Sequence, residues 1–91
     1  MGNKIHCAHI IVEKLSLAQE LKAKISKGES FANLAKQYSI NGSKRRGGDL
    51  GFFGRGMMVP EFEKAAFALE KGQVSDIVKT QFGYHIIKRL D

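Results

Sequence analysis

The sequence predicts a single α+β domain in which helices cover a small antiparallel sheet. Three observations support this prediction. The 91 residues provide the length of one domain, short runs rich in Ile and Val lie near both ends, and helix-like apolar spacing occupies the segments between them. With 43% hydrophobic and 26% charged residues, the composition is that of a globular protein. We therefore expect residues 1–91 to form one domain.

The first element is expected to be a strand over residues 5–12. This run is rich in Ile and Val and contains neither Gly nor Pro. Ile5, Cys7, His9 and Ile11 should face one side, and the alternate residues the other. Because both faces carry apolar side chains, the strand should be central in its sheet.

Two helices are expected to follow this strand. Ser16 and Gln19 have the spacing of a capping box, and Gly28 suits the end of the first helix. Ser30 is expected to cap the second helix. The apolar residues of the two helices are Leu17, Leu21 and Ile25, then Phe31, Leu34, Ala35 and Tyr38.

The pattern changes over residues 39–56. This segment holds six glycines, the basic run 44–46 and a short apolar island at 50–53, which can form only a short strand. A third helix should begin near Pro60 and end near Gly72. Two strands, 74–79 and 84–90, should then form a hairpin around the turn 81–83. We interpret the glycine-rich segment as the functional one.

The sequence excludes several kinds of site. It has no GxxxxGK[ST] phosphate loop and no G-x-S-x-G nucleophile motif. Cys7, His9 and His85 could converge as metal ligands, but paired CxxC or HxxxH spacing is missing. We therefore expect no metal and no cofactor, and interpret His9 and His85 as a hydrogen-bonded pair in which each fixes the tautomer of the other.

The net charge and the length of the apolar runs limit the classes of partner that are possible. The formal charge of +6 permits acidic partners, including nucleic acid, but the run 44–46 lacks the interleaved aromatic residues that stack on single strands. No apolar run approaches the roughly 18 residues that a membrane helix needs. Cys7 is the single cysteine of the sequence, so an internal disulfide is excluded.

Four segments carry a resemblance to a known family. They are HCAHIIV at 6–12, GGDLGFF at 47–53, MVPEF at 58–62 and FGYHII at 82–87. In order and spacing they resemble the parvulin family of peptidyl-prolyl cis/trans isomerases. The resemblance implies a four-stranded antiparallel sheet surrounded by helices, in the order strand, two to three helices, strand, helix, strand, strand. The active site would lie on the sheet.

The resemblance also implies which residues form the site. His9 and His85 match the paired histidines of the family, and Thr80 matches a hydroxyl-bearing position near them. The pocket for the substrate proline ring is implied to consist of Leu50, Met58 and Phe62, with Phe53 lining the same cavity.

Asn41 departs from the family pattern, which has Cys or Asp at this position. An amide carries no charge and cannot act as a thiolate, but it both donates and accepts hydrogen bonds. We therefore expect a non-covalent mechanism in which Asn41 contacts the rotating carbonyl. The alternative is that Asn41 and Gly42 only form a turn.

The function expected from the resemblance is isomerisation of X-Pro bonds in proline-containing peptides and folding polypeptides, without a cofactor. Only Glu13 and Lys14 directly follow the first strand, where phosphate-directed relatives have a basic loop, so we expect no requirement for a phosphorylated residue. The alternative is a non-catalytic peptide-binding or chaperone module. We expect a monomer located in the cytoplasm, or a domain excised from a larger exported foldase.

Overall fold

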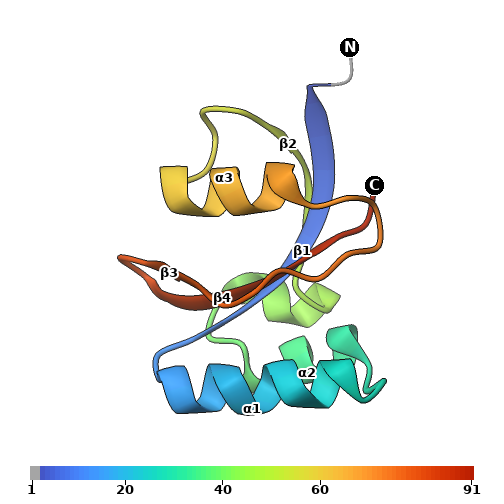
Figure 1. Ribbon diagram of the computed structural model, residues 1–91, viewed down its shortest axis with the longest axis vertical. Helices are drawn as coiled ribbons and strands as arrows, with labels where there is room; N and C mark the ends of the chain where they lie inside the picture. Colours follow the sequence, from blue (N-terminus) through green and yellow to red (C-terminus); the bar gives the residue numbers. More distant parts are fainter. Residues whose placement is uncertain (1–2) are drawn as a thin grey trace.

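The computed structural model describes residues 3–91 and has the predicted order of elements (Figure 1). The elements are β1 (Lys4–Val12), α1 (Leu15–Ser26), α2 (Phe31–Tyr38), the 3-10 helix η1 (Gly42–Arg46), β2 (Asp49–Gly54), α3 (Pro60–Ala68), β3 (Val78–Thr80) and β4 (Gly83–Arg89). All strand pairs are antiparallel, in the order β2-β1-β4-β3. The predicted α+β class and central position of the first strand are confirmed.

The sheet separates two apolar clusters. In Figure 1, α1 and α2 lie below the sheet and α3 lies above it. Ala8, Ile10 and Val12 of β1 face α1 and α2, whereas Ile5 and Cys7 pack on the side of α3. Because side chains alternate along a strand, β1 contributes to both clusters and ties the two helical layers together.

The ends of the first two helices confirm two of the predicted signals and correct one. Ser30 caps α2, accepting a hydrogen bond from the Asn33 N–H at 3.2 Å, and Gly28 follows α1 with a φ of 97°. The prediction that Ser16 caps the first helix is wrong. Because α1 begins at Leu15, Ser16 already lies inside its first turn, where it cannot occupy the capping position.

The predicted strand 74–79 is shorter than expected. Only Val78–Thr80 pairs as a strand, and Val74 forms an isolated bridge to Lys88. Between them, Ser75 supplies both kinds of contact to β4: its N–H donates to the Ile87 carbonyl at 2.7 Å, and its hydroxyl accepts from the Ile87 N–H at 3.0 Å. The Ser75 hydroxyl therefore takes the place of a backbone carbonyl in the ladder. The alternation of apolar and polar residues in the sequence cannot predict such a contact.

Where the pairing with β2 ends, residues of the glycine-rich segment form hydrogen bonds with the same edge of β1. The His9 N–H donates to the Gly48 carbonyl at 2.9 Å. Further along, the Ile11 N–H donates to the buried Ser39 hydroxyl at 3.1 Å, and the Ile40 N–H donates to the Ile11 carbonyl at 2.9 Å. These contacts attach the chain on either side of η1 to β1.

The helices of residues 3–91 include none with both the length and the apolar character needed to cross a bilayer.

The contact between Gly48 and β1 predicts a large cost for any side chain at this position. Gly48 has a φ of +86°, and an added Cβ would lie 2.2 Å from the His9 carbonyl oxygen. We expect Gly48→Ala to lower the free energy of unfolding by about 2–4 kcal/mol, measured by urea denaturation. The matched control is Gly42→Ala, whose Cβ would meet nothing within 4 Å, and which should change stability by less than about 1 kcal/mol. Equal effects of the two substitutions would contradict this account of the loop.

Candidate functional site

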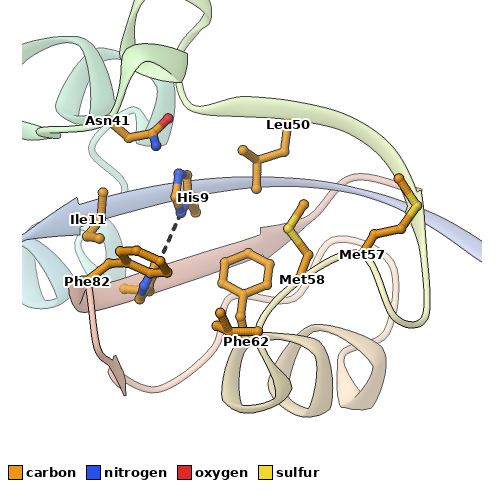
Figure 2. Close-up of a pocket in the computed structure, with 10 residues that line it drawn as sticks. His9, Ile11, Asn41, Leu50, Met57, Met58, Phe62 and Phe82 are labelled. Atoms are coloured by element: carbon orange, nitrogen blue, oxygen red, sulfur yellow. Dashed lines mark hydrogen bonds between the residues drawn. The ribbon is translucent and has the colours of Figure 1, made fainter.

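A groove of about 350 Å³ opens on the face of the sheet that carries α3 (Figure 2). Elements far apart in the sequence contribute to it: β1, β2, β4, α3, the start of η1 and the turn between β3 and β4. The lining residues are His9, Ile11, Asn41, Leu50, Met57, Met58, Val59, Phe62, Phe82 and His85. Six of the eight residues singled out from the sequence are among them: His9, Asn41, Leu50, Met58, Phe62 and His85.

The two histidines meet across the central strand pair. In the register of β1 and β4, His9 is opposite Ile87 and His85 is opposite Ile11, so the histidines are diagonal neighbours. Their Nδ1 atoms lie 3.1 Å apart, with both side chains buried. This contact confirms the predicted hydrogen bond between them.

Thr80 extends this hydrogen-bond chain behind the groove. Its hydroxyl oxygen lies 2.7 Å from Nε2 of His85 and accepts the Phe82 N–H at 3.1 Å. Thr80 is itself buried, so it supports His85 from β3 while the turn residue Phe82 lines the groove. The predicted hydroxyl near the histidines is therefore present.

Burial keeps both histidines neutral near neutral pH. Loss of solvent lowers the pKa of His9 to about 4, an effect that the neighbouring Asn41 side chain partly offsets. Loss of solvent also lowers the pKa of His85 to about 4, and His9 contributes in the same direction. Two neutral rings that meet through their Nδ1 atoms share one proton, since only one Nδ1 can donate in the contact.

An aromatic and aliphatic wall faces the histidines. The Phe62 ring stands edge-on to both, with centroids 5.6 Å from His9 and 5.3 Å from His85. Leu50 and Met58 continue this wall, and Figure 2 shows them beside Phe62 on the side of the groove formed by β2 and the start of α3. The wall is therefore apolar where it approaches the polar floor.

Phe53 lies behind the wall and not on it. Its side chain is 1% exposed and packs against Phe62 and Phe67 at centroid distances of 6.0 and 6.1 Å. The prediction that Phe53 lines the cavity is corrected: this residue supports the wall from the core. Gly51, with a φ of 73°, interrupts the regular alternation of β2 and brings Leu50 and Phe53 to the same side of the sheet.

Asn41 both forms a turn and faces the groove. Its Oδ1 accepts the Ser43 N–H at 2.8 Å, which makes Asn41 the cap of η1. Figure 2 shows its amide directed toward the His9 ring. Within residues 3–91, the buried Nε2 of His9 has no hydrogen-bond partner, and both His9 and Asn41 line the groove.

Four lining residues were missed in the sequence: Ile11, Met57, Val59 and Phe82. Ile11 had a usable signal, because it follows His9 by two positions and so shares its face of β1. Phe82 had none, since a turn residue can point in any direction. In the structure it is 59% exposed and lines the groove.

The ligand set considered from the sequence does not assemble. Within the described range 3–91, no three His, Cys, Asp or Glu side chains are placed to hold a metal ion. Cys7 lies in the core beneath α3, where burial raises the pKa of its thiol to about 11. Cys7 therefore remains a thiol near neutral pH.

Comparisons with known proteins give a consistent result. A family described as "Rotamase: PPIC-type PPIASE domain" matches residues 11–91. The chain is 60% identical over 89 residues to the foldase protein PrsA of Geobacillus sp. strain WCH70. That match covers 97% of this chain but only 32% of the relative, so the chain spans about a third of this foldase.

Two solved structures show the same fold in different settings. PrsA from Bacillus subtilis superposes with a TM-score of 0.95 at 51% identity, covering 98% of this chain and 35% of that one. NmPin, the parvulin of Nitrosopumilus maritimus, superposes with a TM-score of 0.90 at 51% identity, covering 100% of this chain and 99% of that one.

The buried histidines predict how stability depends on pH. Their pKa is about 4 in the folded chain against an ordinary 6.5, so between these values the unfolded chain binds more protons. The free energy of unfolding should therefore decrease as the pH is lowered from about 6.5 to about 4. Urea titrations across this range would measure the decrease, and His85→Gln, which removes one of the two groups, should make it smaller. A slope unchanged in this variant would contradict the assignment.

Proposed function

The chain belongs to the PPIC-type peptidyl-prolyl cis/trans isomerase family, the parvulins, and from this premise we propose that its groove accelerates rotation about X-Pro bonds by a non-covalent mechanism. The observation that carries the proposal is that an apolar wall and a hydrogen-bonding floor of two neutral histidines meet in one groove.

The reaction requires no bond to the substrate. Rotation about a peptide bond removes amide resonance, with a barrier of about 20 kcal/mol. A site lowers this barrier when it binds the twisted amide better than either planar form. The groove suits this task because it removes the proline ring and its amide from water while offering few, fixed polar contacts.

The apolar wall is the proposed site for the proline ring. Leu50, Met58 and Phe62 belong to β2, the segment before α3 and α3 itself, so the wall is assembled by the fold and partly open to solvent. Phe62 is held in place by Phe53 behind it. A ring held against this wall has its preceding carbonyl free to turn toward the floor.

The polar floor is proposed to bind the rotating carbonyl. When Thr80 donates its hydroxyl hydrogen to Nε2 of His85, His85 donates from Nδ1 to His9, and the remaining proton of His9 is on Nε2. The exposed amide of Asn41, with this buried Nε2–H beside it, is proposed to contact a carbonyl oxygen whose negative charge increases as resonance is lost.

Covalent attack is not part of the proposal. The described residues that line the groove include no thiol and no hydroxyl, and the Cys7 thiol is in the core. The amide of Asn41 is not a nucleophile that could form an intermediate with the substrate carbonyl.

The substrate is proposed to need no phosphate before proline. β1 ends at Val12 and α1 begins at Leu15, so Glu13 and Lys14 alone connect them, and no basic loop arises there. Ile11 and Phe82 line the groove beside the histidines and favour an uncharged or apolar residue before proline. The exposed run 44–46 on η1 could add a preference for an acidic residue.

Proline-containing segments of folding polypeptides are the proposed partners. The PrsA relative is named a foldase, and this chain corresponds to about a third of it. NmPin shows that the same fold also occurs with almost no additional chain. The monomeric state and the cytoplasmic location are further proposals, with a domain of a larger exported foldase as the alternative setting.

The test is NMR exchange spectroscopy on short X-Pro peptides with and without the protein. We expect faster cis-to-trans exchange for peptides with an apolar residue before proline, and no additional gain for a phosphoserine peptide over its unmodified form. Chemical-shift changes on binding without faster exchange would show that the chain binds peptides but does not catalyse the rotation. A phosphopeptide requirement would contradict the proposed substrate.

Substitutions in the wall and the floor make the test specific. Met58→Ala should lower kcat/KM about tenfold, because a ring contact is lost, and Asn41→Ala should lower kcat more than it raises KM. The matched control is Leu15→Ala on α1, an apolar residue that is 43% exposed in the layer on the far side of the sheet. An effect of Leu15→Ala equal to that of Met58→Ala would contradict the assigned wall, and an unchanged turnover in Asn41→Ala would remove this residue from the mechanism.

A further inference from the structure

Asn41 is followed by Gly42 at the mouth of the groove. Asn41 caps η1, and Gly42 is the first residue of this 3-10 helix. Both residues are exposed to solvent, although Asn41 also lines the groove beside His9. The pair therefore combines a position in the site with free access of water.

An asparagine followed by glycine can react with itself. The backbone nitrogen of the following residue attacks the side-chain amide carbon and closes a five-membered ring. Any other following residue hinders this approach with its side chain, whereas glycine has no Cβ and adapts its backbone easily. The space around Gly42 is open, since an added Cβ would meet nothing within 4 Å.

The surroundings of the pair favour the attack once the cap has opened. In the folded turn, the Ser43 N–H donates to Oδ1 of Asn41 at 2.8 Å, and this hydrogen bond must break first. The basic run 44–46 follows directly and adds positive charge nearby. Gly42 is the first residue of η1, and the first N–H of a 3-10 helix has no acceptor within that helix. The Gly42 N–H is therefore not held by a hydrogen bond of η1.

The fold permits the necessary rotation. Asn41 has a ψ of 150°, so its side chain must leave the capping position before the ring can close. In η1, Ser43 is half-buried and the other four residues are exposed, so opening this single turn disrupts little packing. Ser39 and Gly48 remain attached to β1 on either side during such an opening.

We propose that Asn41 is a site of spontaneous deamidation, which converts the neutral amide at the groove into a carboxylate. The Gly42 nitrogen loses its proton to solvent and bonds to Cγ, and Nδ2 takes up a proton and leaves as ammonia. Water then adds to one of the two carbonyls of the cyclic imide and opens it. Opening at one carbonyl gives aspartate, and opening at the other gives isoaspartate.

The product changes the electrostatics of the site. A carboxylate at position 41 would face His9, whose pKa is lowered to about 4 by burial, and an adjacent negative charge raises a histidine pKa. The isoaspartate product also lengthens the backbone by one carbon between Ser39 and Gly48, the two residues that attach this segment to β1. The groove would therefore change with the age of the protein.

Peptide mapping of aged protein tests the proposal. The full chain is incubated at mildly alkaline pH, digested with trypsin and analysed by mass spectrometry. Cleavage after Lys36 and Lys44 releases residues 37–44 with Asn41 alone, and cleavage after Lys27 and Lys36 releases residues 28–36 with Asn33. Asn33 is followed by Leu34 within α2 and serves as the internal reference.

We expect the peptide 37–44 to convert to a mixture of aspartate and isoaspartate at least tenfold faster than the peptide 28–36. The matched variant is Gly42→Ala, which the open space around Gly42 tolerates and which should slow the conversion while leaving exchange catalysis by fresh protein unchanged. Equal rates for the two peptides, or a Gly42→Ala protein that converts as fast as the original, would overturn the proposal.

Turnover of the same samples measures the consequence, which rests on the proposed function. The pH profile of aged protein should move toward that of an Asn41→Asp variant, whereas aged Gly42→Ala protein should keep the original profile. The two failures are distinguishable: fresh protein that accelerates no X-Pro exchange would contradict the proposed function, while the mass analysis alone decides the modification.

Discussion

The groove depends on one buried contact, between the Nδ1 atoms of His9 and His85, 3.1 Å apart. Burial disfavours a charge on either ring, and two charged rings at this distance would repel each other, so both rings are neutral. One of their two N–H protons lies between the two Nδ1 atoms. A neutral floor lets the Phe62 edge approach both rings. Hence an apolar wall and a polar floor can form one site without an ion between them.

This contact in turn depends on how β1 is held at both edges. On one side, the register with β4 makes the two histidines diagonal neighbours. On the other side, the pairing with β2 reaches only as far as Ala8, opposite Asp49, the first residue of β2. Beyond it, Gly48 and Ser39 form hydrogen bonds with His9 and Ile11. Position 48 requires glycine because its backbone lies against the backbone of His9, which leaves no room for a side chain. The same contacts bring Asn41 beside His9.

The sequence was most informative where a local pattern and a tertiary requirement agree. Alternation in β1 predicted its two faces, and the cap at Ser30 was read correctly. It was least informative where a tertiary contact decides the outcome: Ser75 replaces part of a strand ladder, and Phe62 and Phe67 pack against Phe53 in the core. The lining residue Phe82 is placed by the turn between β3 and β4, whose direction no local pattern specifies.

The central claim is that a neutral histidine pair forms the floor of a non-covalent isomerase site. The most direct measurement is the pH dependence of kcat/KM for X-Pro exchange, followed by NMR with freshly prepared protein. The account predicts a constant value from about pH 8 down to about pH 5, with a decrease only as the pH approaches about 4, where the buried pair would be protonated. A transition near the ordinary histidine pKa of 6.5 would contradict it, because one ring would then be charged in the working groove.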